Sequence, residues 1–452
     1  MEEFARVVGA ENVLVAPSQR TCYAADFYPG ERHLPAAVVV PRRVVEVPAV
    51  VRLAYRYGLP LVPRGSGTSV TGGVVPVRGG LILDLSRLNH VLRVDAPNLY
   101  AVLEPGVVWA DLNRALAGHG LFTPATPGSG RVSTVGGSVA CGGSGMRSLK
   151  YGTVREQVLA LTVVLPGGEA IHLGSRTAKT ACGYALKDLF IGAEGTLGVI
   201  TEVTLKLWPR PAATVVVEAE LEALEEATTA LGVLRREGMT PAAYELVPAA
   251  TLRLAGRADF PAAGLLMAEF DGAEAEVDRA GARLGQLLRG PRWVWADAAA
   301  RADAWRRFGE IYFCLARLKP SPVAEDVGVP VAEVPRALRL LEELFRSHGV
   351  EAGLMSHAGD GTIHCVLSAD REDAAAWAQV RAARAALYRL VLELGGTLTT
   401  EHGLGISRAP FARWQLGGAQ RLMRQIKQAV DPQNLMNPGK MGLEPAAGED
   451  AG

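Results

Sequence analysis

The sequence is poor in cysteine, and its few cysteines are not arranged for disulfide or metal chemistry. Five occur in 452 residues, an odd number, and no two of them form a CxxC pair. Disulfide frameworks, zinc ribbons and iron–sulfur sites need paired cysteines, so the spacing argues against all three. A reducing cytoplasm is the expected location. The five are Cys22, Cys141, Cys182, Cys314 and Cys365.

The chain also lacks an excess of either charge and lacks long apolar runs. Lys and Arg balance Asp and Glu at 47 each, and the basic residues form no dense cluster, which argues against a nucleic-acid partner. No apolar stretch approaches the roughly 18 residues that span a bilayer, and the start MEEFARVVGAENV does not resemble a secretory signal. We therefore expect a small-molecule partner and membrane contact only through other subunits. A length of 452 residues indicates more than one domain.

Glycine, by contrast, is abundant and clustered. The first cluster, at 64–80, follows a pattern of buried strand, amphipathic stretch (44–57) and short strand GLPLVP; the second lies at 128–152. Unencumbered backbone N–H groups in such loops can cradle a pyrophosphate. The spacing GSGTSVTGG is not the GxGxxG of a Rossmann fold, and strands follow it instead of a long helix. Either loop alone is more simply a tight turn, but both together with IGAEGTLGVITE at 191–202 favour a cofactor site.

Several long segments are similar to the FAD-linked oxidases, whose flavin domain is of the vanillyl-alcohol-oxidase and p-cresol-methylhydroxylase (PCMH) type. They are PRGSGTSVTGG (63–73), TPATPGSGRVSTVGG (123–137), LKYGTVREQVLALTVVLPGGE (149–169) and DLFIGAEGTLGVITEVTLKL (188–207). The resemblance implies an α+β fold: a two-subdomain FAD-binding domain plus a cap domain with an antiparallel sheet flanked by helices. The expected divisions are an N-terminal segment packing on the FAD domain (1–34), the FAD domain (35–210), the cap (211–400), a segment returning to the FAD domain (401–442) and a disordered tail (443–452).

Carried over residue by residue, the resemblance predicts the FAD contacts. The first loop, the second loop, the adenine-side strand and the C-terminal segment contribute Arg64, Gly65, Ser66, Gly67, Thr68, Ser69, Pro127, Ser129, Thr134, Gly136, Gly137, Gly143, Tyr151, Gly152, Glu194, Gly195, Thr196, Gly198, Ile200 and Asn437. Some relatives attach FAD covalently through a histidine in the first loop. This chain has Thr68 and no histidine there, which predicts noncovalent FAD.

A second cluster, of histidine and glutamate, lies in the C-terminal half. The run GLMSHAGDGTIHCVLS has two strand-like halves around Asp360-Gly361, a two-residue hairpin signal. Counting outward from that turn opposes His357 to His364, close enough for both imidazoles to bind one divalent metal. Glu401, in TTEHGLG, offers a third ligand. From spacing alone, a hairpin with two solvent-facing histidines is a fair alternative.

The resemblance adds roles to these residues. Family members that oxidise D-lactate, glycolate or D-2-hydroxyglutarate carry HxGDGNxH and SGEHGxG, and the matching positions imply that His357, His364 and Glu401 bind a divalent metal, commonly zinc, with His402 as general base. The implied reaction is FAD-dependent oxidation of a small D-2-hydroxy acid to the 2-oxo acid, with hydride transfer to flavin N5. Arg306 and Arg307, in AWRRFGEIYF, are candidates for binding the substrate anion, with ordinary surface arginines on a helix as the alternative.

The chain departs from the family pattern at three places. Thr362 replaces the family's Asn, Thr399-Thr400 replaces Ser-Gly, and Ala125-Thr126 interrupts a PPDP element that includes a flavin-site acid. Two other functions stay open: an FAD subunit of a multi-subunit glycolate oxidase with little activity alone, and a non-redox enzyme like alkylglycerone-phosphate synthase. An external electron acceptor or partner redox subunit is expected, and homo-oligomerisation stays open.

Overall fold

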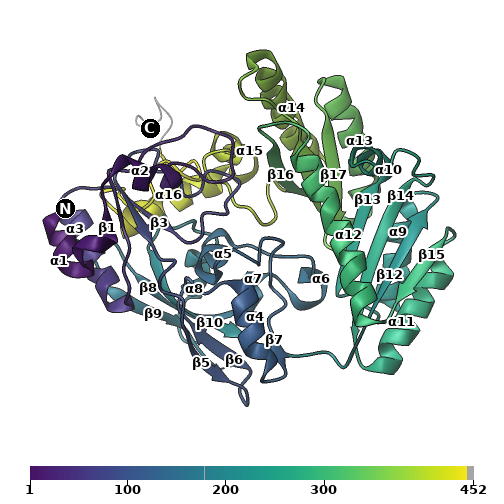
Figure 1. Cartoon of the computed structure of the whole chain (residues 1–452), viewed down its shortest axis with the longest axis horizontal. Helices are drawn as coiled ribbons and strands as arrows, with labels where there is room; N and C mark the ends of the chain where they lie inside the picture. The colour runs from purple at the N-terminus through teal and green to yellow at the C-terminus, as the bar shows by residue number, and fades with distance from the viewer. Residues whose placement is uncertain (178, 445–452) are drawn as a thin grey trace. The chain divides into compact units, whose positions relative to one another are not determined.

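A computed structural model describes residues 1–177 and 179–444 of the chain, which divides into two units (Figure 1). The first unit comprises residues 1–145, 152–210 and the described residues from 401 onward; the second comprises 146–151 and 211–400. The chain thus changes unit after Arg210 and again after Thr400, and it also makes a short excursion at 146–151 that lies inside the segment expected to be FAD domain. The expected tail at 443–452 lies, from residue 445 onward, outside the described residues.

The first unit contains two sheets. One has the order β1-β2-β4-β3, with a parallel core of β2 (Ala37–Val39), β4 (Leu81–Asp84) and β3 (Leu61–Arg64), and with β1 (Val13–Leu14) antiparallel at its edge. The other is antiparallel, in the order β5-β6-β10-β8-β9, and is built from β5 (Val91–Asp95), β6 (Tyr100–Leu103), β10 (Val199–Lys206), β8 (Val158–Val164) and β9 (Ala170–Gly174). The short strands β7 (Leu121–Phe122) and β11 (Trp208–Pro209) pair separately.

Helix α3 (Val47–Arg56) shows how the sequence builds the first sheet's core. Val47, Val50, Val51 and Ala54 recur at helical spacing and are fully buried, whereas Arg52 and Arg56 are exposed. The buried stripe packs with Phe4 and Val8 of α1 (Glu2–Val8) against the parallel strands, so the N-terminal segment completes this core. The predicted order of strand, amphipathic helix, strand and glycine loop is confirmed.

The second sheet is covered by α4 (Trp109–Ala117) and α5 (Val135–Cys141), whose Trp109, Leu112, Leu116, Val135 and Val139 lie in one apolar core with β6, β8 and β10. The remaining elements of the first unit are η1 (Ala10–Asn12), α2 (Pro17–Arg20), η2 (Thr21–Tyr23), η3 (Val44–Glu46), α7 (Val154–Gln157), α8 (Lys187–Phe190), η5 (Ala409–Phe411), α15 (Ala412–Leu416) and α16 (Gly418–Val430).

The second unit is built on a seven-stranded antiparallel sheet with the order β15-β12-β14-β13-β17-β18-β16. Its strands are β12 (Ala213–Leu221), β13 (Ala243–Pro248), β14 (Gly264–Gly272), β15 (Arg292–Trp295), β16 (Val323–Gly328), β17 (Ala352–His357) and β18 (Thr362–Leu367). Its helices are α6 (Ser148–Tyr151), α9 (Glu225–Arg236), α10 (Ala249–Leu254), α11 (Glu274–Leu287), α12 (Ala298–Ala316), η4 (Val331–Glu333), α13 (Val334–Ser347) and α14 (Ala374–Glu393).

Helices cover both faces of this sheet. On one face, Phe308, Ile311 and Leu315 of α12 pack against a core that includes Met267 and Met355. On the other, α11 lies so close that a Cβ on Gly281 would contact the side chains of Val215 and Val217. An antiparallel sheet flanked by helices is the fold predicted for the cap. In the described part of the chain, no helix has both the length and the apolar character needed to cross a membrane.

Candidate functional site

A cavity with about 480 Å³ of empty space, open solvent at its mouth included, lies in the first unit and is lined mainly by glycines and apolar side chains. Segments far apart in the sequence meet there: the end of β3, the start of α5 and the 193–200 region. Its walls are Pro63, Arg64, Gly65, Leu85, Pro105, Thr134, Gly136, Gly137, Ala140, Phe190, Ala193, Gly195, Gly198 and Ile200.

Several of these glycines are required by close packing. A Cβ on Gly65 would lie 2.2 Å from Thr134 Oγ1, one on Gly136 would lie 2.4 Å from Pro105 Cβ, and one on Gly198 would lie 2.8 Å from Val163 Cγ1. At these glycines the cavity wall is therefore backbone, whose N–H and C=O groups can approach a ligand closely. These features fit a dinucleotide such as FAD.

Two polar residues beside the glycine loops add to this fit. Arg64 is buried, and its guanidinium donates to the carbonyls of Ala25 (3.0 Å) and Cys22 (3.4 Å); burial lowers its pKa, and the charge of Asp26 opposes that effect. Asn437 donates to the carbonyls of Gly73 (2.9 Å) and Glu194 (2.6 Å), but its buried Oδ1 has no hydrogen-bond partner among the described residues. An unpaired buried acceptor is costly unless water or a ligand supplies the missing donor.

Eight of the predicted FAD contacts line this cavity: Arg64, Gly65, Thr134, Gly136, Gly137, Gly195, Gly198 and Ile200. The other twelve do not line it and stay predictions: Ser66, Gly67, Thr68, Ser69, Pro127, Ser129, Gly143, Tyr151, Gly152, Glu194, Thr196 and Asn437. Tyr151 belongs to the second unit, where its hydroxyl donates to Asp271 at 2.8 Å. Sequence reasoning missed Leu85, Pro105 and Phe190, since isolated apolar residues carry no recognisable signal.

Glu194 has a role that the sequence did not indicate. Its buried carboxylate accepts hydrogen bonds from the backbone N–H groups of Leu404 (2.6 Å) and Gly405 (2.8 Å). A Cβ on Gly403 would lie 2.6 Å from Glu194 Oε1, so this glycine allows the close approach. Burial raises the pKa of Glu194, while the two amides favour its charged form. The loop that follows His402 is thereby fixed within the first unit.

In the second unit, the hairpin of β17 and β18 differs in register from the prediction. His357 opposes Thr362, and His364 opposes Met355, so the loop has four residues (358–361) and not two. A two-residue turn at Asp360-Gly361 would require a positive φ at Asp360, and in type I′ at both residues, but only Gly361 adopts one (+94°). The predicted direct opposition of the two histidines is therefore wrong.

The two histidines nevertheless lie together. Met355 and His357 are two residues apart on one strand, and Met355 opposes His364, so all three side chains share a sheet face. Nε2 of His357 lies 3.1 Å from Nε2 of His364, and the rings meet edge to face. The two Nε2 atoms thus lie within hydrogen-bond distance of each other.

Glu245 of β13 lies directly opposite His357 in the sheet, on the Nδ1 side of its imidazole. The Glu245 carboxylate lies 2.6 and 2.8 Å from His357 Nδ1 and is 2% exposed. Burial raises the pKa of Glu245, and the charge and hydrogen bond of His357 oppose this rise. Glu245 was not among the predicted residues, because its pairing depends on the order of the strands.

The third expected ligand, Glu401, is the first residue of the first unit after the chain leaves the second. Within the first unit it accepts a 3.5 Å hydrogen bond from Ser144 Oγ. On the other side of the boundary, Asp326 accepts hydrogen bonds from the hydroxyl of Thr399 (2.9 Å) and from Thr400. The chain is therefore anchored on both sides of the bond that joins Thr400 to Glu401.

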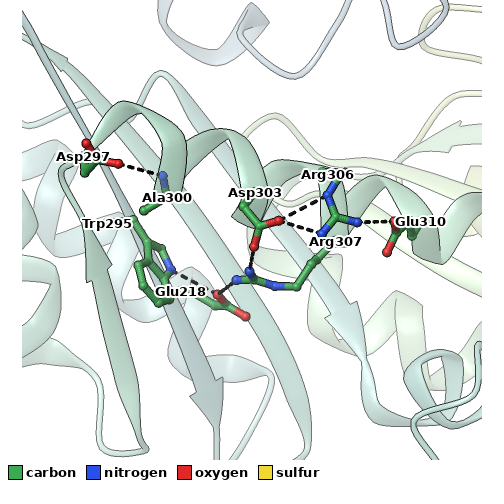
Figure 2. Close-up of polar contacts among 8 residues, drawn as sticks. All are labelled: Glu218, Trp295, Asp297, Ala300, Asp303, Arg306, Arg307 and Glu310. Carbon is green, nitrogen blue, oxygen red and sulfur yellow. Dashed lines mark hydrogen bonds and ion pairs between the residues drawn. The ribbon is translucent and has the colours of Figure 1, made fainter.

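Figure 2 shows where the two predicted substrate arginines lie on α12. Arg306 pairs with Asp303 (2.6 Å) and Glu310 (2.5 Å) on the exposed side of the helix, and its side chain is 59% exposed. Arg307 pairs with Asp303 and, at 3.2 Å, with Glu218 of β12. Both guanidinium groups already have acidic partners, and substrate binding by either stays a prediction.

Family models match both parts of the chain. Residues 35–174 match the model described as FAD binding domain, and residues 210–441 match the model described as FAD linked oxidases, C-terminal domain. The chain belongs to the FAD-linked oxidase family. It is an FAD-linked oxidoreductase, as predicted.

Named relatives of this FAD-linked oxidase align over nearly the whole chain. The glycolate oxidase subunit GlcD of Bacillus subtilis is 33% identical and covers 97% of this chain and 96% of its own length. The probable mitochondrial D-lactate dehydrogenase of Danio rerio is 31% identical and covers 98% of this chain and 91% of its own length.

Solved structures share the fold at lower identity. A substrate-bound p-cresol methylhydroxylase has a TM-score of 0.80 at 19% identity and covers 98% of this chain and 96% of its own. An alkyldihydroxyacetonephosphate synthase has a TM-score of 0.77 at 20% identity, covering 97% and 85%. The predicted PCMH-type α+β fold class is confirmed. Because a methylhydroxylase and a synthase both have this fold, it does not decide the reaction of this FAD-linked oxidase.

Proposed function

We propose that this FAD-linked oxidase is a dehydrogenase or oxidase of a small D-2-hydroxy acid, of the glycolate or D-lactate type, and forms the 2-oxo acid. The observation that carries the proposal is the pair of imidazole nitrogens, His357 Nε2 and His364 Nε2, 3.1 Å apart in the unit that does not contain the flavin cavity. A fold that needed only FAD would not require such a pair. Both named relatives act on, or belong to enzymes that act on, 2-hydroxy acids by name.

FAD binding is assigned to the twenty residues predicted from the sequence, with the glycine-walled cavity as support for eight of them. When bound, FAD supplies the hydride acceptor at N5. The protein holds it noncovalently, because the first loop contains Thr68 where a covalent attachment would use a histidine.

His357, His364 and Glu401 form the divalent-metal site, with zinc as the metal we expect. Two imidazoles and one carboxylate are a usual ligand set for a catalytic zinc, which keeps a position free for substrate. A cation held by these three residues would supply a Lewis acid that lowers the pKa of the substrate hydroxyl. Asp326 lies opposite His364 in the sheet and accepts hydrogen bonds from Thr399 and Thr400. Glu401 follows these two residues directly, which supports its assignment as the third ligand.

His402 takes the proton of the substrate hydroxyl as general base. An imidazole has an ordinary pKa of about 6.5, which suits proton transfer near neutral pH. The Glu194 carboxylate supports this role, because it fixes the backbone two and three residues beyond His402. Arg306 and Arg307 stay candidates for binding the substrate anion. Each guanidinium group would first have to exchange an acidic partner for the substrate.

The reduced flavin is reoxidised by an external acceptor or a partner redox subunit. Because the Bacillus subtilis relative is named as a subunit, turnover that requires such a partner is the second candidate function. Peripheral membrane contact would come through the same partner.

The test is anaerobic mixing of the purified protein with glycolate, D-lactate and L-lactate while the visible flavin absorbance is recorded. Flavin reduction requires only the FAD bound to this chain, so the result does not depend on the acceptor that later reoxidises the flavin. We expect glycolate or D-lactate, and not L-lactate, to bleach the flavin. If none of a wider panel of 2-hydroxy acids bleaches it, the proposal fails and a non-redox, synthase-like reaction becomes the better explanation.

A further inference from the structure

Three buried carboxylates of the second unit pair with permanent cations, while a fourth, Asp326, accepts hydrogen bonds from Thr399 and Thr400. Glu269 pairs with Arg147, Asp271 with Lys150 and Glu325 with Arg384, each a side chain that carries a permanent positive charge. Glu245 is equally buried, but its hydrogen-bond partner is the imidazole of His357. A fixed cation is the simpler way to stabilise a buried carboxylate, so the choice of histidine needs another reason.

The geometry supplies that reason. An ionised carboxylate only accepts hydrogen bonds, so Nδ1 of His357 carries the proton and Nε2 keeps its lone pair. That lone pair faces the Nε2 of His364, 3.1 Å away. A tetrahedral metal at about 2.0–2.1 Å from two nitrogens separates them by about 3.3–3.4 Å. A shift of a few tenths of an ångström therefore opens the pair to a metal ion.

We propose that Glu245 is a positioning residue that fixes the tautomer and ring orientation of His357 and so sets the affinity of the metal site. The inference rests on the proposed function, because it requires His357 to be a ligand. A carboxylate behind a metal-binding histidine holds the ring and raises its basicity, and losing such a partner commonly costs 10- to 100-fold in metal affinity.

The sheet makes this arrangement rigid. Glu245 and His357 lie directly opposite each other on β13 and β17, and the neighbouring pair of Leu246 and Ser356 has the same register. Neither partner lies on a loop. The backbone ladder therefore sets the distance between carboxylate and imidazole, and the sheet itself is expected to orient the ligand.

The experiment measures zinc affinity, with the FAD retained, in metal-depleted holoprotein that competes with a chelating dye. We expect Glu245→Gln to weaken zinc binding by 10- to 100-fold, because the amide keeps an acceptor but loses the charge. Glu245→Asp keeps the charge but withdraws the carboxylate by one methylene, and we expect a similar loss. FAD content should match the wild type in both variants.

Glu325→Gln is the matched control. Glu325 is also buried, on β16, but it lies on the opposite sheet face from His364 and its partners are Arg384 and Tyr388. We expect it to lower the unfolding midpoint and to leave zinc affinity unchanged. A merely structural role of Glu245 would give that same result for the Glu245 variants and would overturn the inference.

His357→Ala separates this inference from the proposed function. If wild-type protein binds one zinc ion and His357→Ala does not, the metal site stands. Wild-type zinc affinity in both folded Glu245 variants would then contradict only the proposed role of Glu245 and not the metal site. If wild-type protein binds no zinc, or if His357→Ala binds it normally, the metal site itself is wrong and the inference fails with it.

Discussion

Asp326 accepts two hydrogen bonds from Thr400, one from the backbone N–H at 2.6 Å and one from the hydroxyl at 3.0 Å. The carboxylate is fully buried, and the hydroxyl of Thr399 donates to the same oxygen. The family pattern has Ser-Gly at these two positions, and a glycine could offer only its N–H. The departure in this chain therefore adds one hydroxyl donor to the anchor that precedes Glu401.

Removing that hydroxyl should cost stability. Thr400→Val keeps the side-chain shape and the backbone N–H but removes the second donor to Asp326. A hydrogen bond to a charged group contributes about 1.5–3 kcal/mol, so we expect a loss of that order in the free energy of unfolding, measured in urea. Thr229→Val on the exposed side of α9 is the control and should stay within about 0.5 kcal/mol of the wild type. Equal stability of the two variants would show that the anchor is unimportant.

Gly65→Ala should weaken FAD binding. The added Cβ would lie 2.2 Å from Thr134 Oγ1, so either the first loop or the start of α5 must move at the cavity wall. We expect at least a tenfold rise in the FAD dissociation constant, measured by fluorescence titration of apoprotein. Gly118→Ala, where the new methyl meets open space, should bind FAD normally. Normal binding in Gly65→Ala would remove this cavity from the FAD site.

The flavin should be released when the protein is denatured. Thr68 offers no imidazole for a covalent bond, so acid precipitation or SDS should leave the polypeptide colourless and all flavin in the supernatant. Mass spectrometry of the intact denatured chain should then give the sequence mass. Yellow colour that migrates with the polypeptide would contradict noncovalent binding.

Lys440 should make stability depend on pH. It is 1% exposed, and burial lowers its pKa from 10.5 to about 8, while its Nζ donates to the carbonyl of Val75. Between these pH values the unfolded chain binds more protons than the folded one, so stability rises with pH across this window. At 1.36 kcal/mol per pH unit, the wild type should gain up to about 3 kcal/mol relative to Lys440→Met. Urea unfolding from pH 7.5 to 10.5 measures this, and a constant difference would contradict it.

Local patterns in the sequence were sufficient to predict much of the first unit. The buried stripe of α3 and the glycine loop that starts at Arg64 depend on neighbours within a few residues, and period and turn chemistry reveal such features. The same local rule failed at the hairpin, where Asp360-Gly361 read as a two-residue turn. The choice between a two-residue and a four-residue loop depends on the backbone angle of Asp360, which the dipeptide alone does not determine.

Long-range pairing explains what the sequence could not reveal. Glu245 precedes His357 by 112 residues, and Glu194 precedes Leu404 by 210, so nothing in either local pattern relates the partners. Arg306 and Arg307 show the opposite case, in which the deciding partners lie close by in the sequence. Their acidic neighbours Asp303 and Glu310 were visible at helical spacing, but the resemblance drew attention to the arginines alone.

The proposed chemistry is tested most directly by the rate at which D-lactate or glycolate reduces the bound flavin in wild-type protein and in His402→Ala. Both proteins are first matched for FAD and metal content, so that only the base differs. We predict rapid anaerobic bleaching in the wild type and a rate roughly 10²- to 10⁴-fold lower in His402→Ala, the usual contribution of general base catalysis. Flavin reduction at the wild-type rate in His402→Ala, or no reduction in either protein, would contradict oxidation of a 2-hydroxy acid at this site.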